Sequence, residues 1–188
     1  PNFDKMDELS QQKVPFFFMI DFLVEKVEVY LENELSKNKV LVDFSRFTND
    51  AIASQSEIDK TQLKAFPQTK DIYKIGFNKV QQNLKLGNSY LTNYTCKTEI
   101  EINHSLEEIF YLSKAKYKVL YQDEFVFFSP ETFVEIVDHE IFTHPMKGTI
   151  DAAKENAIEV LKNDIKEKAE HYTVVDLLRN DLSMVADE

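Results

Sequence analysis

The residues best suited to chemistry lie in the last third of the sequence. Glu131 follows a strand-like stretch within SPE, and a carboxyl group held where a strand ends can act as a general acid. Lys147 precedes Gly148 and Thr149, in a chain with only 3 glycines among 188 residues. A partly desolvated lysine is a good nucleophile, because burial disfavours its ammonium form. Gly148 would let a ligand approach the backbone closely, and Thr149 could donate a hydrogen bond to that ligand.

Two further carboxylates, Glu167 and Glu170, stand three residues apart in a helix-like run. At about 100° per residue they share one face with apolar side chains. The residues of this face are Glu167, Glu170, His171, Val174, Leu178 and Asp181. Because a solvated face seldom carries Val and Leu, we expect this half of the helix to be buried on both sides. Two enclosed carboxylates need a cation, and with oxygen ligands Mg²⁺ is the natural candidate.

Each of these residues also has an ordinary structural interpretation. KEKAE is a common pattern for a solvated helix face with ion pairs between residues four apart. Glu131 could be a turn glutamate, and Lys147 a solvated turn lysine. The other histidines lack metal-like spacing, and Cys96 is expected to be packed within a strand. The patterns alone leave the chemical and the structural interpretations open.

Composition narrows the class of protein. The length suits one domain, or a large part of one, and 43% hydrophobic residues can form a real core. The net charge of −11 argues against nucleic acid or anionic membranes as partners, but a local pocket can still be positive. The apolar stretch 15–24 is too short to span a membrane, and Asp21 interrupts it. With one cysteine and no disulfide, a cytoplasmic location is expected.

The first half of the chain predicts strands followed by one helix. Residues 1–13 are polar and are expected to be a disordered or frayed lead. Residues 14–32 favour one or two strands, and the alternation in residues 39–47 predicts a third. Residues 48–69 are expected to form a long loop. Residues 71–87 predict an amphipathic helix that ends at a glycine.

The second half mixes both kinds of element. Residues 89–102 return to a strand pattern, and residues 105–115 predict a short helix with a capping box formed by Ser105 and Glu108. Three or four strand segments that follow predict an antiparallel meander. One long helix is expected from about 151 to 182, with a core-facing stripe of Ile158, Leu161, Ile165, Tyr172 and Val175. Without a regular βαβ rhythm, the class is α+β.

Four stretches, in order, resemble the chorismate-utilising enzymes, which include anthranilate, aminodeoxychorismate, isochorismate and salicylate synthases. They are GNSYLTNYT, FFSPETF, HPMKGT and KEKAEHYTVVDLLRNDL. The resemblance covers roughly residues 70–188, with weaker support over 14–47. It implies two antiparallel sheets facing each other, with helices packed outside and chorismate in the cleft between. Residues 14–188 would be the N-terminal portion of the catalytic domain. The absent C-terminal portion would carry further metal ligands, so the chain alone would be inactive.

The lysine before Gly-Thr is most similar to the aminodeoxychorismate synthase branch. The resemblance implies that Lys147 adds to C2 of chorismate while Glu131 protonates the departing 4-hydroxyl. Ammonia from a glutamine amidotransferase partner would then add at C4, giving 4-amino-4-deoxychorismate for p-aminobenzoate and folate synthesis. Glu167 and Glu170 would bind Mg²⁺. The substrate site would be lined by Gly148, Thr149 and His171.

Three residues depart from the pattern of this branch, and two alternatives stay open. Met146 occupies a position where the family usually has isoleucine. Thr132 follows SPE where the family often has arginine, and Thr173 lies where methionine is common. None of these changes removes a group with an implied chemical role. One alternative is anthranilate synthase component I with an unusual lysine. The other is a non-catalytic half-domain that pairs with a complementary chain.

Overall fold

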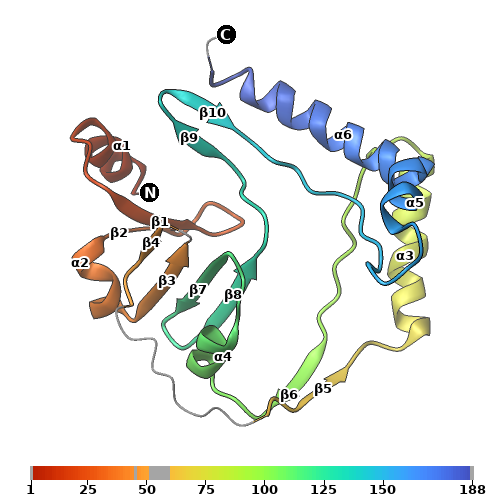
Figure 1. The fold of residues 1–188 in the computed structure, drawn as a ribbon, viewed down its shortest axis with the longest axis horizontal. Helices are drawn as coiled ribbons and strands as arrows, with labels where there is room; N and C mark the ends of the chain where they lie inside the picture. Colours follow the sequence, from red (N-terminus) through yellow and green to blue (C-terminus); the bar gives the residue numbers. More distant parts are fainter. Residues whose placement is uncertain (1, 45, 51–59, 187–188) are drawn as a thin grey trace. The chain divides into compact units, whose positions relative to one another are not determined.

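The computed structural model describes residues 2–44, 46–50 and 60–186. It forms two compact units, one made of residues 1–52 with 113–188 and the other of residues 53–112. Helices alternate irregularly with antiparallel strand pairs, which confirms the predicted α+β class (Figure 1). Among the described residues, no helix combines the length and apolar character needed to cross a membrane.

A four-stranded antiparallel sheet is the centre of the first unit. Its strand order is β4-β3-β7-β8, with bounds Phe47–Thr48, Val40–Phe44, Tyr117–Tyr121 and Phe125–Ser129. The alternation that predicted β3 is confirmed, because Val40 and Val42 are fully buried. Phe44, on the same face, is half-buried and packs against the core.

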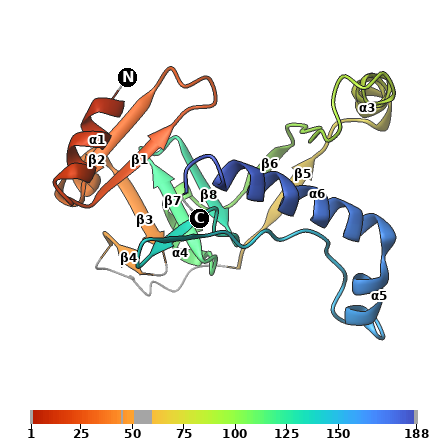
Figure 2. The same cartoon turned by 90° about the horizontal axis from the view of Figure 1, so that it is seen from above.

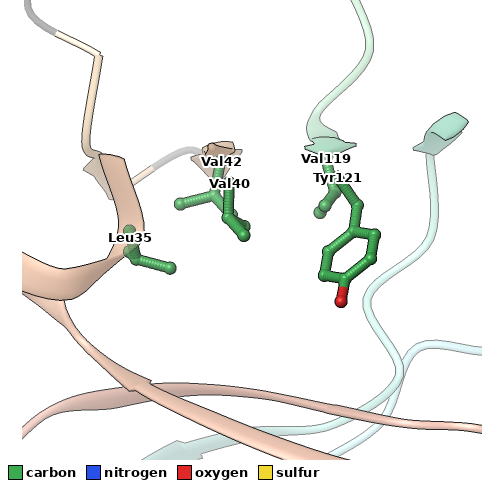
Figure 3. Close-up of a cluster of buried hydrophobic side chains, with 5 residues drawn as sticks. All are labelled: Leu35, Val40, Val42, Val119 and Tyr121. Carbon is green, nitrogen blue, oxygen red and sulfur yellow. The ribbon is translucent and has the colours of Figure 1, made fainter. Parts of the chain in front are cut away.

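The buried core lies on one face of this sheet (Figure 3). Its members are Leu35, Val40, Val42, Val119 and Tyr121. Leu35 comes from the short helix α2 (Glu32–Leu35), which continues into a 3-10 turn at Ser36–Asn38. Burying each of these apolar side chains stabilises the fold by roughly 1.5–3 kcal/mol. The core therefore fixes β3 and β7, and β7 pairs with β8, the strand that leads into the turn with Glu131.

The N-terminal residues are ordered, which corrects the expected frayed lead. Residues Phe3–Gln11 form helix α1, ahead of the antiparallel hairpin of β1 (Phe16–Ile20) and β2 (Val27–Leu31). Asn2 Nδ2 donates to the Val27 carbonyl at 2.9 Å, and Lys5 Nζ donates to the Val29 carbonyl at 3.0 Å. Polar composition suggested fraying, but these polar side chains bind the free edge of β2.

A polar cluster joins the β1–β2 hairpin to the sheet. The Tyr121 hydroxyl donates to Glu28 Oε2 at 2.6 Å, and the Tyr30 hydroxyl donates to the same oxygen at 2.7 Å. Lys26 Nζ lies 3.0 Å from Glu28 Oε1. Desolvation opposes ionisation of Glu28, but the hydrogen bonds from Tyr121, Tyr30 and Lys26 together lower its pKa. The cluster holds a carboxylate at the edge of the core.

The expected meander is present as two separate hairpins. Strands β7 and β8 pair within the central sheet, whereas β9 (Glu135–Val137) and β10 (Glu140–Phe142) form a two-stranded sheet of their own. The turn between β9 and β10 places Asp138 at φ 51° and His139 at φ 69°. From β10 a segment without regular structure runs to the next helix and carries HPMKGT (Figure 1).

The predicted long helix at 151–182 is wrong, because two helices form instead. They are α5 (Ala157–Asn163) and α6 (Ile165–Leu182), which differ in direction (Figure 2). Asp164 separates them with extended backbone, φ −70° and ψ 117°. Its side chain accepts a hydrogen bond from the Glu167 amide at 3.0 Å. An aspartate can therefore end one helix and cap the next without glycine or proline.

The second unit contains the strand pair β5 (Leu63–Phe66) and β6 (Glu99–Ile102) with helices α3 (Lys70–Lys85) and α4 (Leu106–Leu112). Strand β5 corrects the expected loop at 48–69, of which residues 51–59 lie outside the described part. Strand β6 covers only the end of the predicted strand at 89–102, so Cys96 lies in irregular chain. The predicted capping box is confirmed, since Ser105 and Glu108 exchange hydrogen bonds.

Helix α3 confirms the amphipathic helix predicted for 71–87, and Gly87 follows it at φ 75°. Within the helix, Gly76 lies against the hydroxyl end of the Tyr94 side chain. A Cβ atom on Gly76 would overlap the Tyr94 hydroxyl. The Tyr94 ring also packs on Tyr73, with 5.2 Å between ring centroids. This contact holds the irregular stretch after GNSYLTN against α3.

Candidate active site

Glu131 is held by the turn that ends β8. The Ser129 hydroxyl accepts a hydrogen bond from the Glu131 amide at 3.2 Å and donates one to the Glu131 carbonyl at 3.0 Å. The carboxylate then accepts a hydrogen bond from the Met146 amide, with 3.1 Å between Oε1 and N. The structure therefore brings Glu131 to the residue that directly precedes Lys147. The sequence shows no signal for this contact across fifteen residues.

Gly148 is the point where the HPMKGT segment meets the helices. Its φ of 81° lies in the left-handed region that favours glycine. A Cβ atom there would lie 3.2 Å from Glu167 Oε2 and 3.2 Å from a Leu161 methyl. The neighbours of Gly148 are thus protein side chains, and the expected approach of a ligand to its backbone stays a prediction. Gly148 therefore lets the chain next to Lys147 reach Glu167.

Glu167 and Glu170 lie on the more covered face of α6, but the helix is not buried on both sides. Glu167, Glu170, His171, Val174 and Leu178 are half-buried, whereas Asp181 is exposed. The stripe expected to face the core is the open one, with Ile165 and Tyr172 85% and 66% exposed. Of that stripe, Leu161 is half-buried, and Ile158 and Val175 are exposed. Burial on both sides was therefore expected wrongly, because the apolar stripe is exposed.

One lysine pairs with both carboxylates. Lys166 Nζ lies 2.7 Å from Glu167 Oε1 and 3.8 Å from Glu170 Oε2. The hydrogen bond to Glu167 is the main reason that the pKa of Lys166 is raised, and the charges of both carboxylates add to it. The pair between Lys166 and Glu170 is the ion pair between residues four apart that the structural interpretation of KEKAE predicted.

A hollow of about 270 Å³ lies between the HPMKGT segment and the two helices. It is lined by Lys147, Leu161, Lys162, Glu167, Lys168, His171 and Tyr172. Three lysines and one histidine therefore surround a single carboxylate. In a chain of net charge −11, this is a locally positive site, which suits a small anion. Lys162 and Lys168 are lining residues that the sequence patterns did not single out.

The structure brings together part of the predicted set. Lys147, Glu167 and His171 line the same hollow, and Gly148 packs on Glu167. Glu131 reaches the Met146 amide, and Glu170 reaches Lys166. Lys147 itself is exposed, as is Thr149, so the partial desolvation expected for the lysine is not seen in this chain.

The donor set of α6 fits a hard divalent cation. Glu167 and Glu170 present carboxylate oxygens on one helix face and would be the residues to hold such a cation, at a position where the Lys166 ammonium now lies. Within residues 2–44, 46–50 and 60–186, no cluster of three or more acidic, histidine or cysteine side chains suited to a metal is present. Two carboxylates completed by water and substrate oxygens are a usual environment for Mg²⁺.

Comparison with known protein families identifies the chain. The model of the chorismate binding enzymes matches residues 10–188. Together with the α+β fold and the positive hollow beside the carboxylates, this match shows that the chain belongs to the chorismate-utilising enzyme family. No solved structure matches the chain significantly.

Relatives in the family carry different names and differ in their sequence identity to this chain. An uncharacterized PabA-like protein of Haemophilus influenzae is 44% identical over 98% of this chain and 56% of its own length. Anthranilate synthase component 1 of Bacillus subtilis is 31% identical over 87% of this chain and 35% of its own. Aminodeoxychorismate synthase component 1 of Escherichia coli is 23% identical over 98% of this chain and 44% of its own. The chain thus spans about half the length of the relatives it matches.

Proposed function

We propose that the complete protein is an aminodeoxychorismate synthase component I, which converts chorismate and ammonia to 4-amino-4-deoxychorismate. The observation that carries the proposal is the placement of Lys147. It lines a positive hollow with Glu167 and His171, and the amide just before it holds Glu131. A nucleophile, a carboxyl group and an anion-binding hollow are what displacement of a hydroxyl from an anionic ring requires.

In the proposed reaction, the neutral amine of Lys147 bonds to C2 of the ring. The ring double bond shifts and the C4–O bond breaks, while Glu131 gives its proton to the departing oxygen, so that water leaves. Ammonia then bonds to C4, the double bond shifts back, and the lysine departs as the free amine. The Glu131 carboxylate recovers a proton from the new ammonium group. Chorismate and ammonia thus give aminodeoxychorismate and water.

Other residues position the substrate in this proposal. Gly148, Thr149 and His171 would contact the ring substituents, and Lys162 and Lys168 give the rim of the hollow positive charge. Glu167 and Glu170 would hold Mg²⁺, which when bound offsets the negative charge of a substrate carboxylate. A glutamine amidotransferase partner would supply the ammonia, as the resemblance implies.

The test identifies the reaction product and measures how much its formation depends on Lys147. The complete protein is incubated with chorismate, Mg²⁺ and ammonia, and products are separated by chromatography. Aminodeoxychorismate is expected, and Lys147→Ala should lower its formation at least about 100-fold, because the covalent step loses its nucleophile. Lys154→Ala, outside the hollow, is the matched control and should keep wild-type activity. Unchanged turnover in Lys147→Ala would exclude the nucleophile role.

Anthranilate synthase is the second candidate. A specific observation favours it: the Bacillus subtilis anthranilate synthase is 31% identical, against 23% for the Escherichia coli aminodeoxychorismate synthase. The same incubation separates the two, since anthranilate is fluorescent and forms with loss of pyruvate. Anthranilate as the main product would replace the first proposal with this one.

A further inference from the structure

The turn after β8 carries a polar cluster that the proposed chemistry does not use. Thr132 Oγ1 accepts a hydrogen bond from Lys116 Nζ at 2.9 Å and lies 2.6 Å from the Tyr117 hydroxyl. The Lys116 ammonium also lies over the Tyr117 ring, 5.0 Å from its centroid. Because Thr132 directly follows Glu131, this cluster acts on the turn that carries the proposed general acid.

The cluster is anchored to the central sheet. Tyr117 begins β7 and pairs in register with Phe44 of β3 and Ser129 of β8. Its ring meets the Phe44 ring edge-on, with 5.7 Å between centroids. Phe44 packs on the buried core. Through Tyr117 and Phe44, the Thr132 hydroxyl is therefore connected to the buried core of the sheet.

Hydrogen bonds hold Glu131 on both sides along the chain. Before it, the Ser129 hydroxyl binds both its amide and its carbonyl. After it, the Thr132 hydroxyl binds Lys116 and Tyr117. Because these bonds hold the chain before and after Glu131, only rotation of its own side chain can move the carboxylate. In that position the carboxylate accepts a hydrogen bond from the Met146 amide.

We propose that Thr132 is a positioning residue: its hydroxyl ties the turn to Lys116 and Tyr117 and so fixes the location of the Glu131 carboxyl group. The inference rests on the proposed function, because the location affects turnover only if Glu131 is the general acid. A hollow of about 260 Å³ beside the cluster, lined partly by Arg46 and Glu135, leaves the turn room to shift once the hydroxyl is removed.

The Tyr117 phenol gives a readout that does not depend on turnover. The hydrogen bond with Thr132 is the main cause that lowers the pKa of Tyr117. Desolvation and the charge of Glu135 act against it, and Lys116 acts with it. Loss of the Thr132 hydroxyl should therefore raise the Tyr117 pKa, which ultraviolet or NMR titration of the complete protein measures against a Tyr117→Phe reference.

The variants are Thr132→Val and Thr132→Ser in the complete protein. Valine keeps the shape but loses the hydroxyl, and kcat should fall about 10- to 100-fold, because a shift of about 1 Å can cost that much. KM should stay within about 2-fold, since uniform substrate binding is untouched. Serine should restore most of kcat and the Tyr117 pKa. Thr48→Val on β4, whose hydroxyl contacts the Asp50 backbone, is the matched control.

Glu131→Gln, assayed in parallel, separates the two proposals. If Glu131→Gln keeps full activity, the general-acid assignment fails. If Glu131→Gln is inactive while Thr132→Val keeps its kcat, the positioning role is overturned and the acid role stands. A loss in Thr132→Val that serine does not restore also overturns it, because the hydroxyl would not be the cause. Should Thr132→Val fail to fold, Tyr117→Phe removes one contact of the same hydroxyl and is expected to lower kcat without raising KM.

Discussion

At the scale of single residues, the sequence could name candidate residues but not their contacts. The types of Lys147, Glu131 and Glu167 allowed a nucleophile, an acid and a metal ligand, but only the resemblance to the family favoured these roles over ordinary structural ones. The hydrogen bond from the Met146 amide to Glu131 could not be predicted, since it joins segments fifteen residues apart. Its geometry depends on the independent β9–β10 hairpin between them.

Gly148 gives a prediction at this scale. Gly148→Ala introduces a side chain at φ 81° and 3.2 Å from Glu167 Oε2. We expect the free energy of unfolding to fall by about 1–2 kcal/mol, because the left-handed conformation is strained for alanine. Chemical denaturation of the complete protein measures it. Gly87→Ala, also at positive φ but with open space around it, isolates the backbone part of the cost. Equal losses at both positions would show that the contact with Glu167 adds nothing.

At the scale of elements, strands and caps were more predictable than helix boundaries. The alternation of valines gave β3 and the Ser105–Glu108 spacing gave the start of α4, because both patterns are local. The break between α5 and α6 at Asp164 was not predicted, because the sequence has no glycine or proline there to mark a helix end. Both faces of α6 were expected to be covered, but the stripe with Ile165 and Tyr172 is open. Periodicity identifies the faces of a helix, but neighbours decide which of them is covered.

Asp164 supplies the prediction for this scale. Asp164→Ala removes the acceptor for the Glu167 amide at the start of α6, and the free energy of unfolding should fall by about 1 kcal/mol. Asp164→Ser, which can still cap the helix, should recover most of this loss. Thermal unfolding followed by circular dichroism compares the three proteins. An alanine variant as stable as the wild type would mean that the cap does not contribute.

At the scale of the whole molecule, the family could be predicted from four ordered motifs. The side-chain contacts that connect elements distant in sequence could not. The Glu28 cluster is one such set of contacts, since it connects the β1–β2 hairpin to Tyr121 of the central sheet. Nothing in the local pattern VEKVEVYL marks Glu28 as different from the other acidic residues. Its importance depends on a tyrosine more than ninety positions away.

The Glu28 cluster makes stability depend on pH. The folded-state pKa of Glu28 is lowered from the usual 4.5, so its contribution is fully present above that pH. As the pH falls below 4.5 through the lowered folded-state value, the contribution is lost. Glu28→Gln should therefore show a smaller decrease in melting temperature between pH 5 and pH 3, measured by calorimetry. Glu25→Gln serves as the exposed control, and equal pH dependence of the Glu28 variant and the wild type would contradict the account.

The contact between Gly76 and Tyr94 has a consequence for how this sequence can change over generations. Glycine within a helix is unfavourable by about 1 kcal/mol relative to alanine, so drift alone would tend to replace it. Any replacement would collide with the tyrosine hydroxyl unless the ring moved first. The two positions are thus linked in descent: a side chain at 76 needs either a smaller residue at 94 or a shift of the Tyr94 ring.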